Sequence, residues 1–201
     1  KFADASDAVD ALAVFASTRV KPAATTREAL AKAVAQSAPQ MRAEDVVRTL
    51  EAFAEAGCVP MPSLAGDALG RAVVRETDSS KGSFGPEAIG DVLRAFRRAG
   101  VAPANAVKDA LARAAVFEAP RMTPKNIAGV MEGYAAAGES PPWSVVSAAV
   151  DAVAREAVNM DADEIADVVG AFARARVCGK LSAVAKSGLD DAVARASSNY
   201  V

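Results

Sequence analysis

Five short stretches of the sequence pair an acidic residue with a basic residue four positions later. One of them, EALAK, spans residues 28–32, and another, DALAR, spans residues 109–113. Positions four apart lie on the same face of a helix, so each acid can form an ion pair with its base. The basic members of the five stretches are Lys32, Arg71, Arg113, Arg155 and Arg195. In a stack of helices they would form a row of cations able to bind phosphates or an acidic partner segment.

This basic column has two interpretations. The five cations contact RNA or a partner, or each one is paired with its own acid and only keeps the surface soluble. We favour the second interpretation, because the nearby acid cancels most of the local field of the base.

A second basic cluster lies in LRAFRRAG, residues 93–100. Arg94 and Arg98 share a helical face and Arg97 is adjacent, so the cluster could contact phosphate; the alternative, a solvated face, is the one we favour. Trp143 follows SPP and could stack on a base or anchor a partner. For Trp143 we favour packing over the turn between two helices.

The sequence offers little that could catalyse a reaction. It contains no histidine, so the Ser–His and Cys–His arrangements of hydrolases are absent, and so are the glycine-rich motifs that bind nucleotides. Cys58 and Cys178 do not make a disulfide framework or a metal site, and we interpret them as small packing residues. We therefore expect no enzymatic activity, no cofactor and no bound metal.

The composition favours helices. The 201 residues are 52% hydrophobic but only 5% aromatic, and they carry a formal net charge of −2. An alanine-rich chain of this kind packs helices closely through small side chains. The basic excess of a dedicated nucleic-acid binder is missing. No apolar run reaches the roughly 18 residues expected of a membrane-spanning helix.

An internal repeat predicts the elements that position these residues. Aromatic side chains recur about every 38 residues, with one longer step between the second and the third, and such a period is typical of stacked helical hairpins. The aromatic residues are Phe15, Phe53, Phe96, Tyr134 and Phe172. The longer step contains TDSSKGS, residues 77–83, which we interpret as a loop. Apolar residues precede each aromatic by seven and by three positions, which places all three on one helical stripe. These residues are Ala8, Leu12, Val46, Leu50, Ile89, Leu93, Ile127, Met131, Ile165 and Val169.

Each module therefore contains a first helix, called A, that carries the aromatic, and a second helix, called B, that carries the acid–base pair. Thr123 with Pro124, and Asp161 with Glu164, are start signals for two A helices. Glycines four positions after the aromatic end three of them, at 57, 100 and 138. On the B helices we expect the aliphatic residue of each motif to point inward. These residues are Leu30, Leu69, Leu111, Val153 and Val193.

The sequence thus predicts an all-α fold, an α-solenoid of five stacked helix-turn-helix repeats with ten helices in a single domain spanning residues 1–201. Modules 1 to 5 cover residues 3–40, 41–83, 84–121, 122–159 and 160–201. The expected A helices span 4–18, 42–56, 86–99, 124–137 and 162–176, and the expected B helices span 26–37, 62–76, 104–118, 141–157 and 181–197. Neither end shows an obviously polar capping repeat, so the chain can also be a piece of a longer array.

The repeat lines resemble a known class of organellar protein. MTPKNIAGVMEGYAAAG (122–138), MRAEDVVRTLEAFAEAG (41–57) and FGPEAIGDVLRAFRRAG (84–100) are similar to the octotricopeptide and heptatricopeptide repeats of algae and other protists. There a methionine and an aliphatic residue lead to an Ala-aromatic-Ala signature, and the match covers all five modules. The resemblance implies an organellar location and, often, RNA binding in processing, translation or ribosome assembly.

We interpret the chain as a non-enzymatic scaffold subunit of a large organellar assembly, first of all a mitochondrial ribonucleoprotein. Its expected partners are other protein subunits and RNA. We expect the chain neither to span a membrane nor to form homo-oligomers. The surface columns of the A helices carry twelve acids against five bases, and an acidic face repels phosphate. Two alternatives stay open: a protein-only accessory subunit of a respiratory or photosynthetic complex, with the chloroplast as the second location, and a repeat arm of a larger enzyme.

Overall fold

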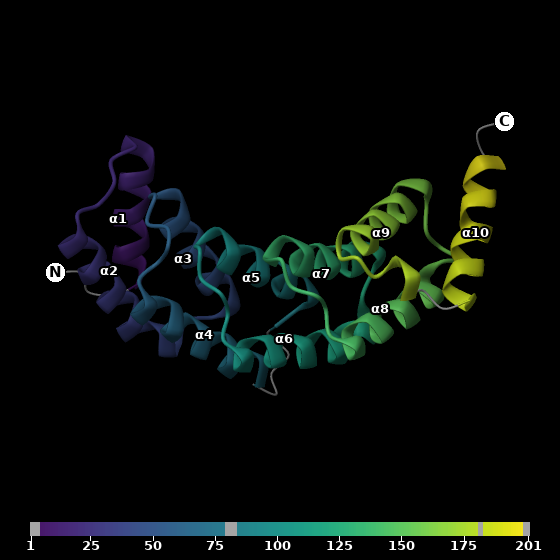
Figure 1. Ribbon diagram of the computed structural model, residues 1–201, viewed down its shortest axis with the longest axis horizontal. Helices are drawn as coiled ribbons and strands as arrows, with labels where there is room; N and C mark the ends of the chain where they lie inside the picture. Colours follow the sequence, from purple (N-terminus) through teal and green to yellow (C-terminus); the bar gives the residue numbers. More distant parts are fainter. Residues whose placement is uncertain (1–4, 79–83, 181–182, 199–201) are drawn as a thin grey trace. The chain divides into compact units, whose positions relative to one another are not determined.

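The protein is built entirely from helices in the part of the chain that the structure describes. The computed structural model describes residues 5–78, 84–180 and 183–198 (Figure 1). The α-helices are α1 (Ala5–Thr18), α2 (Ala24–Ser37), α3 (Ala43–Glu55), α4 (Ser63–Asp78), α5 (Pro86–Arg98), α6 (Asn105–Glu118), α7 (Pro124–Ala137), α8 (Trp143–Glu156), α9 (Ala162–Arg174) and α10 (Ala183–Ser198). Each bound lies within two positions of the expected one, so the predicted all-α repeat fold is confirmed.

The predicted insertion loop is shorter than expected at its start. Thr77 and Asp78 still belong to α4, and the other residues of that loop, 79–83, lie outside the described part of the chain. The hydroxyl of Thr77 donates to the carbonyl of Val74 at 2.8 Å, which lets this residue continue the last turn of the helix.

The chain divides into two compact units. Unit 1 contains residues 1–84 and 91–111, and unit 2 contains residues 85–90 and 112–201. In unit 1, α3 packs on α1 and α4 packs on α2; in unit 2, α9 packs on α7 and α10 packs on α8 (Figure 1). Each unit is therefore a stack in which A helices pack on A helices and B helices on B helices. The single domain over residues 1–201 stays a prediction.

The predicted start signals act as helix caps. The hydroxyl of Thr123 accepts a hydrogen bond from the backbone N–H of Asn126 at 3.3 Å, and Pro124 takes the first helical position of α7. At α9, the carboxylate of Asp161 accepts from the backbone N–H of Glu164 at 2.8 Å, and the carboxylate of Glu164 accepts from the N–H of Asp161 at 3.1 Å. Both caps satisfy backbone donors that have no partner inside the helix.

Every A helix ends at a left-handed residue four positions after its aromatic. Gly57, Gly100 and Gly138 have φ values of 69°, 68° and 72°, as the sequence predicts. Modules 1 and 5 use arginine instead, with φ values of 56° at Arg19 and 60° at Arg176. In each case the next N–H donates to the carbonyl of the aromatic residue, at 2.9–3.2 Å. The turn is therefore common to all five modules, although only three of them supply the glycine that it favours.

The predicted core is confirmed in most places. Phe53, Phe96, Tyr134 and Phe172 are buried, whereas Phe15 in the first module is half-buried. The hydroxyl oxygen of Tyr134 is buried and has no hydrogen-bond partner in the described part of the chain. The other modules place phenylalanine at this position, so the hydroxyl is the feature that sets this aromatic apart.

Two predicted core residues are instead exposed. Val169 of α9 is 39% exposed, and the neighbouring Val168 is buried in its place. Among the described residues, α9 is the last A helix of unit 2, and the residues equivalent to Val169 are buried where another A helix follows in the same unit. These residues are Leu12 and Leu50 in unit 1 and Met131 in unit 2.

Val193 of α10 is 49% exposed, while Leu189 and Ala192 are buried. Counted from the aromatic of its own module, Val193 lies six positions further along the chain than Leu30 does. A shift of this size turns a side chain by about 120° around a helix, so the motif of module 5 faces a different direction.

Candidate interaction surfaces

The arginine cluster of α5 is partly neutralised by carboxylates in unit 1. Arg98 of α5 contacts two carboxylates of α3, at 3.1 Å from Glu51 and 3.8 Å from Glu55. Arg94 forms an ion pair with Asp91, one turn earlier on its own helix. Arg97 is exposed, and its guanidinium has no ion pair or hydrogen bond among the described residues. Of the three predicted phosphate contacts, Arg97 is therefore the one that lacks a competing carboxylate.

The same ion pair recurs in unit 2. Arg174 of α9 contacts the carboxylate of Glu132 of α7. In both units the acid lies two positions before the aromatic of one A helix, and the base lies two positions after the aromatic of the next A helix. This pairing is absent from the sequence-based predictions, although the matched offsets in modules 2 and 3 and in modules 4 and 5 indicate it.

The five bases of the predicted column do not occupy equivalent positions. Lys32, Arg71, Arg113 and Arg155 are exposed on their helices, and the side chain of Arg195 lies outside the described part of the chain. Lys32, Arg71 and Arg113 lie at nearly the same distance along the chain from their module aromatic, but Arg155 lies three or four positions further on. Arg155 therefore sits one helical turn further along its helix than the other three bases do, and the row of cations stays a prediction.

Arg155 is held by a turn rather than by its motif acid. Its guanidinium donates to the carbonyls of Ala119 and Met122, at 3.3 and 3.0 Å, and pairs with Glu156 at 2.8 Å. No ion pair joins it to Asp151 among the described residues. The interpretation that each base is paired with the acid of its own motif is therefore wrong at Arg155.

Arg75 makes the same contacts in unit 1. Its guanidinium donates to the carbonyls of Ala38 and Met41, at 3.0 Å from Ala38, and pairs with Glu76 at 3.2 Å. Arg75 and Arg155 are thus the equivalent residues of modules 2 and 4. On this alignment the counterpart of Arg71 is Asp151. The acid–base motif of module 4 begins four positions further along its helix than the motif of module 2. A shift of four positions keeps the motif on the same helical face, so the sequence pattern alone does not reveal it.

Both anchoring arginines bind a short 3-10 turn between modules. These turns, Ala38–Gln40 and Ala119–Arg121, follow α2 and α6 directly and have proline near their first position. The last carbonyls of a helix lack partners within the helix, and the guanidinium supplies donors to two carbonyls at this junction. Sequence analysis did not identify the turns, but APQM (38–41) and APRM (119–122) are a signal that could have found them.

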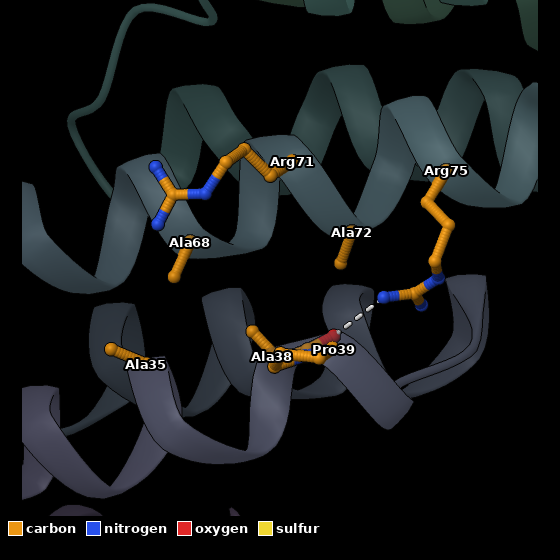
Figure 2. A pocket seen from close by; sticks show the side chains of 7 residues that line it. All are labelled: Ala35, Ala38, Pro39, Ala68, Arg71, Ala72 and Arg75. Carbon is orange, nitrogen blue, oxygen red and sulfur yellow. Dashed lines mark hydrogen bonds between the residues drawn. The ribbon is translucent and has the colours of Figure 1, made fainter.

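A shallow groove lies beside the first of these anchors, between α2 and α4 in unit 1. Its volume is about 250 Å³ (Figure 2). Figure 2 shows Arg75 reaching down to the 3-10 turn, while Arg71 points away from that contact along the α4 wall. Arg71 has no ion pair with Asp67 and no other polar contact among the described residues. The lining residues are Ala35, Ala38, Pro39, Ala68, Arg71, Ala72 and Arg75.

Among the described residues of unit 2, two large aromatic side chains are exposed. Trp143 begins α8 and is 61% exposed, so packing over the neighbouring turn covers only the smaller part of its surface. Phe117 of α6 is 65% exposed and has the guanidinium of Arg121 5.6 Å from the centre of its ring. The sequence analysis did not identify Phe117, which lies outside the repeated motifs.

The two cysteines are free thiols that fill space. Cys58 is buried and Cys178 is half-buried, which confirms their interpretation as packing residues. Burial raises the pKa of the Cys58 thiol above its usual value, and the positive charge of Arg27 opposes this shift. The neutral thiol is therefore favoured at Cys58, which makes it a poor nucleophile.

In the described ranges, no cluster of three or more cysteine and carboxylate side chains could hold a metal ion. None of the described helices is both long enough and apolar enough to cross a membrane. No protein-family model matches the sequence, and no curated protein matches it.

Proposed function

We propose that the chain is a non-enzymatic helical-repeat scaffold that holds neighbouring protein subunits in a large organellar assembly. The proposal is carried by the exposure of Trp143 and Phe117 on a stack whose core is already closed by buried aromatic and small side chains. Tryptophan, phenylalanine and arginine are enriched where proteins bind one another. Stacked repeats present such side chains over an extended surface, as scaffold proteins require.

The organellar setting is supported by the resemblance of the repeat lines to octotricopeptide and heptatricopeptide repeats. Within that setting we propose a mitochondrial ribonucleoprotein, with the chloroplast as the alternative location. Two observations support protein contacts ahead of RNA contacts on α5. Arg94 and Arg98 already contact carboxylates, which an RNA phosphate would have to displace.

A second candidate function, an RNA contact made alongside the protein contacts, is favoured by Arg97. This residue is exposed and has no carboxylate partner among the described residues, so it offers a full positive charge to a phosphate. We expect Arg97→Glu to weaken binding to a single-stranded RNA oligonucleotide at low salt. Arg48→Glu on α3 makes the same charge change at an exposed arginine outside both basic surfaces and is the matched control.

The test of the scaffold is the composition of the native assembly before and after nuclease treatment. The assembly that contains this chain would be purified, digested with ribonuclease and sedimented. We expect the chain to keep sedimenting with other protein subunits after the RNA is removed. If it sediments alone from the start, the scaffold proposal fails; if it is released only by the nuclease, RNA and not protein holds it in place.

A further inference from the structure

We infer that the groove between α2 and α4 binds an acidic segment of a partner protein, with a carboxylate of that segment placed against the guanidinium of Arg71. This inference deepens the proposed scaffold function and rests on it. The groove belongs wholly to unit 1, and all of its lining residues are described. It combines a floor of alanine methyl groups with a cation that has no partner among the described residues.

The charges around the groove leave Arg71 available. Arg75 is engaged by two backbone carbonyls and by Glu76, so its charge is largely satisfied within the protein. Arg71 forms no ion pair with Asp67, the acid one turn before it, in the described part of the chain. An arginine guanidinium presents several parallel donors that fit a carboxylate well. A carboxylate arriving from a partner would therefore complete the charge pairing at this site.

The shape of the groove favours a peptide over a nucleic acid. Five of its seven lining residues are alanine or proline, and none of the seven is aromatic. Single-stranded RNA is gripped mainly by stacking its bases on aromatic side chains, which this lining does not offer. A volume of about 250 Å³ suits small side chains and a short stretch of backbone. The groove thus matches a segment in which acidic residues alternate with small apolar ones.

The equivalent region of unit 2 provides the contrast. Val116 replaces Ala35 and Asp151 replaces Arg71, while Arg155 keeps the role of Arg75. The larger side chain would narrow the groove, and the acid would repel a carboxylate. At the positions equivalent to Ala35 and Arg71, the same protein therefore carries a different residue in unit 2. Arg71→Asp and Ala35→Val are the two variants that this comparison supplies.

The test uses the full chain with isotope-labelled alanine methyl groups, observed by NMR. A blocked peptide of alternating glutamate and alanine is titrated, with a glutamine–alanine peptide as the neutral control. We expect saturable shifts of the Ala35, Ala68 and Ala72 methyl signals with the acidic peptide and none with the neutral one. Arg71→Asp should weaken the acidic peptide about tenfold, as the loss of a charge-assisted pair does. Ala35→Val should weaken it as well, whereas Arg97→Asp on α5 should change the affinity less than about twofold.

Three results would overturn the inference. The first is that the acidic peptide does not shift these methyl signals. The second is that the Arg71→Asp variant binds the peptide as tightly as the Arg97→Asp variant does. The third is that a single-stranded RNA oligonucleotide shifts the same signals at a lower concentration. Circular dichroism checks the fold of each variant, and Arg71→Gln replaces Arg71→Asp if that variant is unfolded. If the acidic peptide does not shift the methyl signals but the chain still sediments with protein subunits, the groove inference is wrong and the scaffold proposal stands.

Discussion

Modules 2 and 4 share their main-chain anchors and differ in the side chains built around them. In each, an arginine of the B helix binds the Ala-Pro 3-10 turn that ends the preceding module, and an acid lies two positions before the aromatic. Around these shared contacts the two copies diverge. In α4, glycines at 66 and 70 lie against Val101 and Val107, whereas α8 has valines at the matching positions. The fold thus keeps the arginine contacts to the carbonyls of the 3-10 turns, whereas the side chains that pack around these contacts can differ in size.

The largest effect is expected where the two modules differ by a single methyl group. A methyl group added at Gly133 of α7 would lie 2.6 Å from the Cα of Gly90, also in unit 2, while module 2 has the buried Ala52 at the matching position. Gly133→Ala should lower the free energy of unfolding by about 1–3 kcal/mol through overpacking. The reverse change, Ala52→Gly, should cost about 1 kcal/mol through helix propensity. Urea denaturation measures both, and a Gly133→Ala variant that is more stable than the original would break the contrast.

The next effect tests whether the two anchors are equivalent. Arg75→Met and Arg155→Met each remove donors from two carbonyls of a 3-10 turn while keeping an apolar stem of similar length. We expect each to lower the free energy of unfolding by about 1–2 kcal/mol, because hydrogen bonds from charged donors are lost. Arg71→Met, with no such contacts, is the control and should be close to neutral. A loss at only one of the two anchors, measured by chemical denaturation, would show that modules 2 and 4 are not built alike.

Tyr134 distinguishes the aromatic of module 4 from Phe53 of module 2. The buried hydroxyl of Tyr134 has no hydrogen-bond partner among the described residues, so Tyr134→Phe should raise the free energy of unfolding by about 0.5–1 kcal/mol. Phe53→Tyr would bury a new hydroxyl and should lower it by about 1–3 kcal/mol. Thermal denaturation of the two variants measures both changes in stability. Changes of the same sign would contradict the prediction that Tyr134→Phe stabilises and Phe53→Tyr destabilises the protein.

The same tyrosine predicts a dependence on alkaline pH. Burial, with a smaller contribution from the negative charge of Glu139, raises the pKa of Tyr134 to about 12. In the unfolded chain a tyrosine ionises near pH 10, so between about pH 10 and 12 the unfolded state binds fewer protons than the folded state. Stability should therefore fall as pH rises through this window, by on the order of 1–3 kcal/mol at its upper end. Tyr134→Phe should lack this part of the loss, which denaturation at pH 9 and pH 11.5 would show.

The smallest effect concerns the ion pairs between A helices. Glu51→Gln in unit 1 and Glu132→Gln in unit 2 should each cost about 0–1 kcal/mol, because both pairs are exposed to solvent. Added salt should screen most of that cost. A double-mutant cycle of Glu132 with Arg174 isolates the pair, and a coupling energy that does not change with salt would contradict a surface interaction.

Much of the fold follows from the sequence because its signals are local. The aromatic spacing, the caps at Thr123 and Asp161 and the glycines after the A helices each depend on a few neighbouring residues. Val193 is exposed because the motif of module 5 lies further along its helix, whereas Val169 is exposed for a different reason. A residue on the apolar stripe is buried only where a neighbouring helix covers it. The packing of the helices determines this, and the periodicity of the residue's own helix does not.

The candidate surfaces were harder to predict. Arg75 and Arg155 bind backbone carbonyls, and every residue has a carbonyl, so the sequence does not mark the acceptors. The motif of module 4 had also slid by one turn, which kept its pattern and changed its neighbours. The groove beside Arg71 exists because Ala35 and Ala68 are small and lie opposite each other on two helices, a relation that only the packed structure reveals.

The spacing of the turn anchors has a consequence for protein engineering. Ala38 and Ala119, which begin the two anchored turns, follow the B helices of modules 1 and 3, so the two anchored turns lie two hairpins apart. The block between the two anchored turns is a set of four helices, α3 to α6. A designer who wants a longer or shorter version should insert or delete such a block whole. A single hairpin inserted directly after either turn would separate that turn from the arginine that binds it, and the new hairpin would need an arginine of its own at this position.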